Sequence, residues 1–255
     1  MNSQQWLRYY ENNRLNRAEP KWNMPSTLDS KMQQAFAQSL SHFQLGETGE
    51  GAFLIGQVRA QLPDDVAYHR ALELFIAEEN EHARLLKRLV IRLGGRIIRR
   101  HWTHSLFRLF RHALGFKFEI QVLVIAELVG TAYYRLLRLR TRDPVLEESC
   151  DLILRDEAMH VDFHADWFGV FQSQLLPIER AAWNLQFQLL FTAAAQVAWV
   201  DHKACLILAG ANRREFFREA RRECIRFLQR LGQCAVGGGN PLPVQTSAWG
   251  SARSA

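Results

Sequence analysis

Residues that break helices are scarce in this chain of 255 residues. Only 7 prolines and 15 glycines occur, and several of them lie near the C-terminal end. Long segments therefore carry no signal that would end a helix. With 48% hydrophobic residues the chain can bury one large core, and its length favours a single domain with extensions. The sequence predicts an all-helical (all-α) fold.

Cysteine is also rare, and its spacing argues against two kinds of site. The four cysteines, Cys150, Cys205, Cys224 and Cys234, show no CxxC spacing, so neither a thiolate zinc site nor a disulfide framework is indicated. The N-terminal segment lacks the apolar stretch of a secretory signal. We therefore expect a protein of the reducing cytoplasm.

No long apolar run is free of polar residues. The most apolar stretch, residues 185–211, is interrupted by Gln186, Gln188, Gln196, Asp201, His202 and Lys203. Charged side chains at such depth are costly in lipid, so this stretch is expected to be a buried or interfacial core helix and not a membrane span. No flavin or nicotinamide fingerprint occurs, so no organic cofactor is expected.

Positive charge, by contrast, is abundant. The net charge is +6, and the arginines gather in residues 84–111 and 213–230. Such a surface suits an acidic partner, for example an electron-transfer protein or an acyl or aminoacyl carrier protein, although a solvated basic face explains it equally well. No nucleic-acid-binding motif accompanies the charge, so nucleic acid is not the expected partner.

Apolar residues recur at helical spacing along most of the chain. We predict four core helices at 27–61, 65–93, 117–140 and 144–174, with a basic, aromatic crossover at 96–115 that has some helix of its own. Two further helices are predicted at 178–209 and 213–231, the latter opened by a capping box of Asn212 and Glu215. We expect residues 1–236, including an N-terminal extension, to form one domain and the tail 237–255 to be disordered.

Two Glu-x-x-His motifs carry the strongest chemical signal. Glu79 and His82 lie on the second predicted helix, and Glu157 and His160 lie on the fourth. Residues three apart share one face of a helix, so each glutamate and histidine can reach the same point in a bundle. One such motif occurs easily by chance, whereas one on the second helix of each hairpin indicates a metal site.

The first helix of each hairpin carries a further glutamate. Glu127 lies within the apolar run 122–130, where an ionised carboxylate needs a compensating cation, either a metal or an arginine. Glu127 and Glu157 are equidistant from the turn at Arg142, so they should lie at equal depth. Glu50 is level with Glu79 by the same argument, and Glu47, one helical turn earlier on the same face, is a rival ligand.

These residues predict a two-metal centre with Glu50, Glu79, His82, Glu127, Glu157 and His160 as ligands. Four glutamates and two neutral histidines carry four negative charges, which balance two divalent ions. The oxygen-rich ligand set favours two iron ions, with manganese as the alternative in one or both positions. Asp156, Asp201 and His202 are candidates for orienting the ligand histidines, although ordinary polar contacts explain them too.

Two helical hairpins joined by a long crossover match the ferritin-like four-helix bundle. Over residues 35–167 the chain resembles the ferritin-like di-iron carboxylate superfamily. The run 78–82 is similar to that of soluble acyl-carrier-protein desaturases, and the run 156–160 to that of di-iron oxygenases. His164 is a candidate seventh ligand, because arylamine N-oxygenases of this superfamily carry an extra histidine. The resemblance implies that reduced iron activates dioxygen.

The leading functional hypothesis is an enzyme, an oxidase or monooxygenase that hydroxylates, desaturates or N-oxygenates an organic substrate, either free or carrier-bound. Electrons would come from a separate ferredoxin or reductase, and we expect a homodimer. The C-terminal helices and the aromatic crossover would enclose the substrate. The alternative is a ferroxidase or iron-binding protein without organic substrate, and a third hypothesis is an interaction module that has lost its metal.

Overall fold

The computed structural model describes residues 1–48, 51–101 and 116–236. Within these residues all regular secondary structure is helical, and there is no β-strand. The helices are α1 (Ser3–Leu15), α2 (Ser30–Glu47), α3 (Gly51–Gln61), α4 (Val66–Arg92), α6 (Phe116–Arg140), α7 (Pro144–Ser173), α8 (Pro177–Leu208) and α9 (Arg213–Val236). The all-helical prediction is therefore confirmed for the described part of the chain.

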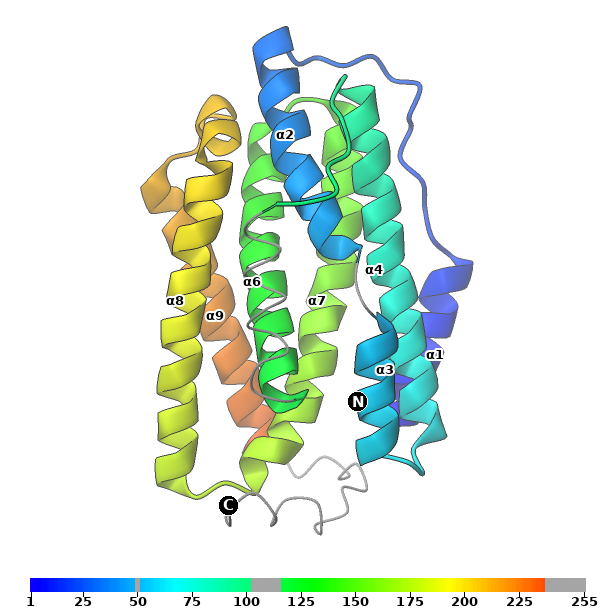
Figure 1. The fold of residues 1–255 in the computed structure, drawn as a ribbon, viewed down its shortest axis with the longest axis vertical. Helices are drawn as coiled ribbons and strands as arrows, with labels where there is room; N and C mark the ends of the chain where they lie inside the picture. Colours follow the sequence, from blue (N-terminus) through cyan, green and yellow to red (C-terminus); the bar gives the residue numbers. More distant parts are fainter. Residues whose placement is uncertain (49–50, 102–115, 237–255) are drawn as a thin grey trace.

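Two antiparallel helix pairs form the centre of the molecule (Figure 1). α2 and α3 pack against α4, while α6 packs against α7, and α4 contacts α7 between the two pairs. α4 ends at one end of the bundle and α6 begins at the opposite end (Figure 1). α8 and α9 cover α6, and α1 lies along α4.

The prediction of one continuous helix over residues 27–61 was wrong, because this range contains two helices, α2 and α3. α2 ends at Glu47, and Thr48 leaves the helical conformation with φ −72° and ψ 76°. The Thr48 hydroxyl donates to the carbonyl of Leu45 at 2.7 Å. Threonine side chains compete in this way with helical hydrogen bonds, and the neighbouring glycines add little helix propensity. Glu47 therefore stands at the end of a helix and not inside one.

The N-terminal extension contains a helix that the sequence analysis did not predict. Asn2 and Gln5 form a capping box at the start of α1, and Trp6 and Tyr10 on its inner face are buried. In the crossover, residues 96–101 are not helical, and the remainder lies outside the described residues, as does the tail. The capping box of Asn212 and Glu215 is confirmed, with each residue's backbone N–H donating to the other's side chain.

One helix of the described part of the chain, α6, is long and apolar enough to cross a membrane. The stretch Lys117–Arg140 has a mean hydropathy of 1.4, but 78% of its most apolar window is buried inside the protein. Core helices satisfy the same criterion, and α6 is enclosed by α7, α8 and α9. The stretch 185–211, which we considered from sequence, does not reach this hydropathy.

Asp143 connects three parts of the fold. It is fully buried and caps α7 by accepting from the backbone N–H of Leu146, while Ser26 and Arg92 donate to its carboxylate at 2.7 and 3.1 Å. Replacing one partner of such a buried network leaves the others without a counterpart.

We therefore expect Asp143→Ala to lower the free energy of unfolding by about 3 kcal/mol. Chemical denaturation followed by circular dichroism measures this change. Asp151→Ala removes an exposed partner of Arg138 and serves as the control, with a loss below about 1 kcal/mol. Equal losses in the two variants would contradict the role given to Asp143.

Candidate metal centre

Four side chains from two helices meet in the centre of the bundle. Glu79 and His82 come from α4, and Glu157 and His160 come from α7. One ligand atom from each of the four lies within 4.8 Å of the others, and all but Glu79 are buried. This group could hold a metal ion, and it consists of the two Glu-x-x-His motifs singled out from the sequence.

The closest approaches within the group bring histidine nitrogens to carboxylate oxygens. His160 Nδ1 lies 2.8 Å from Glu79 Oε1, and His82 Nδ1 lies 3.4 Å from Glu157 Oε1. These contacts are not aligned as hydrogen bonds. His160 Nδ1, Glu79 Oε1 and His82 Nδ1 are all buried without a hydrogen-bond partner. The atoms converge on a common space without satisfying one another.

Unsatisfied buried polar atoms gather at this point of the structure. Besides those three, Glu157 Oε2, Glu127 Oε2 and His164 Nδ1 are buried without a hydrogen-bond partner. Leaving so many buried polar atoms unpaired would cost several kcal/mol, at roughly 1–3 kcal/mol for each. Carboxylate oxygens and imidazole nitrogens are common ligands of divalent metal ions. The donor set therefore fits a metal centre.

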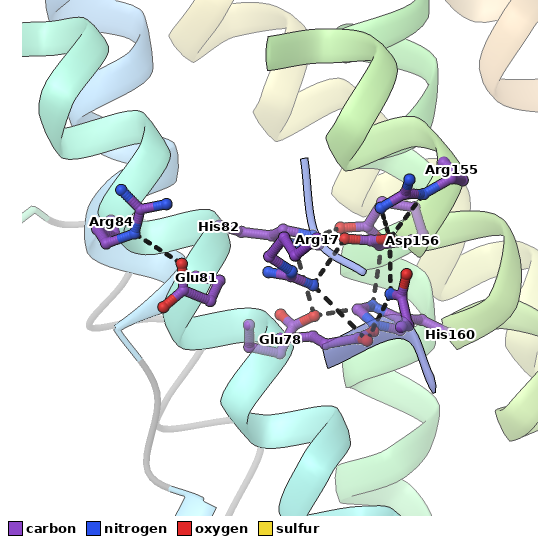
Figure 2. Close-up of polar contacts among 11 residues, drawn as sticks. Arg17, Glu78, Glu81, His82, Arg84, Arg155, Asp156 and His160 are labelled. Carbon is purple, nitrogen blue, oxygen red and sulfur yellow. Dashed lines mark hydrogen bonds and ion pairs between the residues drawn. The ribbon is translucent and has the colours of Figure 1, made fainter. Parts of the chain in front are cut away.

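The other nitrogen of each histidine is held by an acidic residue of the opposite helix. His82 Nε2 on α4 lies 3.3 Å from Asp156 Oδ2 on α7, and His160 Nε2 on α7 lies 3.0 Å from Glu78 Oε2 on α4. Each Nε2–H thus donates outward, which leaves the Nδ1 lone pairs directed at the centre. Figure 2 shows this exchange, with the Glu81–Arg84 pair lying apart from it.

The end of α1 completes this outer layer. Asn13 donates to Glu78 at 2.6 Å and to Asp156 at 3.1 Å, and Arg17 donates to Asp156 at 2.9 Å. Figure 2 places Arg17 beside both acidic residues. Burial alone would raise the pKa of Asp156, but His82 and Arg17 outweigh it and hold the pKa well below its usual range. Asp156 is therefore an anion that keeps His82 in position.

Sequence reasoning identified Asp156 but missed Glu78, Asn13 and Arg17. A signal for Glu78 exists, because an acidic residue directly precedes the glutamate in both Glu-x-x-His motifs. Asn13 and Arg17 carry no such signal. The structure also separates Asp201 and His202 from the ligand histidines, because they contact His42 and Ser39 instead. The prediction that Asp201 and His202 orient the ligand histidines was therefore wrong.

The remaining predicted ligands differ in how the structure places them. Glu127 is buried on α6, and its Oε1 lies 3.2 Å from Nε2 of His164, the candidate seventh ligand. Glu127 stands outside the compact group of four but lines the same cavity as Glu79 and Glu157. Glu47 lies beside Glu79 and lines the same cavity. Glu50 lies outside the described residues.

Without metal, protons must balance the charges of the centre. Burial and the neighbouring Glu79 raise the pKa of Glu47 well above its usual range, and burial raises that of Glu157 to about 7. Burial alone would lower the pKa of His82, but contacts with Asp156 and Glu157 raise it to about 9. For Glu79, burial is outweighed by His160 and His82, which lower its pKa to about 2.

Comparisons with protein families, with curated proteins and with solved structures find no match to this chain. A proposed function therefore rests on the geometry of the described residues.

Metal binding should depend on ligands from both hairpins. We expect the chain reconstituted anaerobically with iron(II) to bind two metal ions, and Glu157→Ala and Glu127→Ala each to abolish two-metal binding, because each removes a carboxylate that balances the ionic charge. Metal analysis after gel filtration measures the stoichiometry. Retention of two ions by both variants would contradict the assignment.

Glu47→Ala and Glu50→Ala, compared in the same assay, determine which of the two glutamates belongs to the centre. The contact between Glu47 and Glu79 leads us to expect the larger loss for Glu47→Ala.

The metal-free protein should lose stability as the pH rises. The pKa of His82 is about 9 in the fold and near 6.5 in an unfolded chain, so its stabilising contribution is present below pH 6.5 and disappears as the pH passes 9. The pKa of Glu157 is raised from 4.5 to about 7, so its ionisation also lowers stability as the pH rises, over the lower part of the range. We expect the free energy of unfolding to fall by a few kcal/mol over the two ranges together.

Metal loading should remove or reverse this trend, because the ions displace protons and bind more tightly at higher pH. Denaturation of chelator-treated and metal-loaded protein at several pH values measures both slopes. The same slope in the two forms would show that these side chains do not bind the metal.

Proposed function

We propose that this chain is a ferritin-like di-iron enzyme, an oxidase or monooxygenase that acts on an organic substrate. The arrangement of helices supports the ferritin-like assignment, because α4 and α6 belong to two hairpins, and α4 ends and α6 begins at opposite ends of the bundle. Each hairpin contributes an inward-facing glutamate and one Glu-x-x-His motif, as ferritin-like di-iron proteins require.

In this proposal the two metal ions are held by Glu79, His82, Glu127, Glu157 and His160, with Glu47 or Glu50 as the sixth ligand. Oxygen-rich ligation favours iron, with manganese as the alternative. When bound, the two iron ions supply the electrons and the binding site for activation of dioxygen. Asp156 and Glu78 fix the tautomers of the histidines, so that both Nδ1 atoms remain available.

The observation that carries the enzymatic proposal is a cavity of about 430 Å³ beside the carboxylates. Glu47, Glu79, Glu127 and Glu157 form part of its wall, and apolar side chains form most of the rest. α8 contributes Ala193, Ala194, Val197 and Ala198, whose small side chains leave the space open. Storage or oxidation of iron requires no apolar chamber, whereas an organic substrate does.

The wall of the cavity indicates the kind of substrate. Phe43, Phe75, Phe118 and Leu123 offer only apolar contacts, so the part of the substrate beside the metal centre should be a hydrocarbon chain or an aromatic ring. Tyr134 also lines the cavity, and its buried hydroxyl has no hydrogen-bond partner. Burial raises the pKa of Tyr134 well above its usual range, so the hydroxyl stays protonated and can donate to a polar group of the substrate.

A separate reductase or ferredoxin would supply electrons, and the arginine-rich segments would favour an acidic donor or an acidic carrier protein. The expected cytoplasmic location belongs to the same proposal.

Filling the cavity should separate the two candidate functions. We expect Ala194→Trp to reduce product formation from medium-chain acyl thioesters or simple arylamines by roughly tenfold or more, because the substrate can no longer reach its position. Iron binding should be unchanged. The assay combines an artificial electron donor with mass spectrometry of the products, and Ala204→Trp, at an exposed position of α8, is the control.

A ferroxidase would instead oxidise successive portions of iron(II) without an organic product and would be insensitive to Ala194→Trp. That result would overturn the enzymatic proposal while leaving the metal centre intact.

A further inference from the structure

A second group of metal-ligating side chains lies outside the centre described above. His42 on α2, Asp201 on α8 and His101, in the segment after α4, each offer one ligand atom, and these atoms lie within 4.8 Å of one another. All three side chains are partly buried. None of them contacts the Glu-x-x-His motifs in the interactions described above, so this group needs its own explanation.

The distances around Asp201 match those between ligands of one metal ion. His42 Nδ1 lies 3.0 Å from Asp201 Oδ2, and His101 Nε2 lies 3.5 Å from Asp201 Oδ1. Ligands bound tetrahedrally at roughly 2.0–2.1 Å from zinc stand about 3.3 Å from one another. The rings of His42 and His101 are stacked, with centroids 3.9 Å apart.

His202 supplies a fourth donor next to this group. Its Nε2 lies 3.7 Å from Asp201 Oδ2, and its Nδ1 lies 2.8 Å from the hydroxyl of Ser39. The Ser39 hydroxyl in turn lies 2.7 Å from that of Tyr133, so the imidazole is held in place from behind. Fixing one ring nitrogen in this way is how proteins direct the other nitrogen at a metal.

The chemistry of this donor set differs from that of the carboxylate-rich centre. His202 is buried, and a neutral imidazole is the form that binds metals. Three imidazoles and one carboxylate are typical ligands of zinc, whereas four glutamates suit iron or manganese. His42, Asp201 and His202 also line the apolar cavity, which provides room for an ion.

We propose that His42, His101 and Asp201 bind one zinc ion, with His202 as the fourth ligand. The site holds the end of α4 against α2 and α8, because its ligands come from all three regions. It does not depend on the proposed oxidase function, since none of its ligands belongs to the iron centre.

Cobalt(II) distinguishes the two kinds of site, because four-coordinate cobalt absorbs visible light far more strongly than five- or six-coordinate cobalt. We expect metal-free protein titrated with cobalt(II) to show this strong absorption, and zinc to abolish it by displacement at one equivalent per chain. Asp201→Asn, His42→Gln and His101→Gln should each weaken binding by about 100-fold or more. His69→Gln, which changes a histidine outside both groups, should bind as the wild type does.

Circular dichroism shows whether each variant is folded, and the glutamine variants keep a polar group in place where a truncation would disturb packing. Glu157→Ala separates this proposal from the previous one, because it should empty the iron centre and leave the strong cobalt absorption unchanged. Absence of that absorption in the wild type, or its persistence in folded Asp201→Asn and His42→Gln, would overturn the zinc site whatever the iron centre binds.

Discussion

The structure depends on the exchange of acidic and imidazole groups between α4 and α7. Asp156 of α7 holds His82 of α4, and Glu78 of α4 holds His160 of α7. Because each pair joins the two hairpins, the contact fixes the depth of one hairpin relative to the other. The same contact directs both Nδ1 atoms inward, where the remaining carboxylates lie. A displacement along either helix would break both pairs together and leave buried charges without partners.

The elements outside the two hairpins serve this arrangement in different ways. α1 and the segment that follows it bring Asn13 and Arg17 against the two acidic residues, so the charges of Glu78 and Asp156 are balanced on the side away from the centre. α8 lies on the other side and lines the cavity with small side chains. The centre is thus closed on one side by polar contacts and bordered on the other by an apolar space, which is a suitable combination for chemistry on an apolar substrate.

The break between α2 and α3 determines where the first hairpin places Glu47. At Thr48 the backbone departs from the helix, and Glu47 is placed at the last helical position beside Glu79. Among the described residues, no atom lies within 4 Å of a Cβ added at Gly46, whereas a Cβ added at Gly51 would lie 2.5 Å from Ile76. Glu47 therefore lies beside Glu79 at the end of α2.

The sequence by itself determined the all-helical class, the bounds of α4, α6, α7, α8 and α9 to within a few residues, and the meeting of the two Glu-x-x-His motifs. These features depend on local spacing along a helix, which is regular and can be read from one chain. Glu78, Asn13, Arg17 and the grouping of His42, His101 and Asp201 were decided by tertiary structure alone. They join segments up to about 160 residues apart, as His42 and Asp201 do, and helical periodicity contains no information on which faces of distant helices meet.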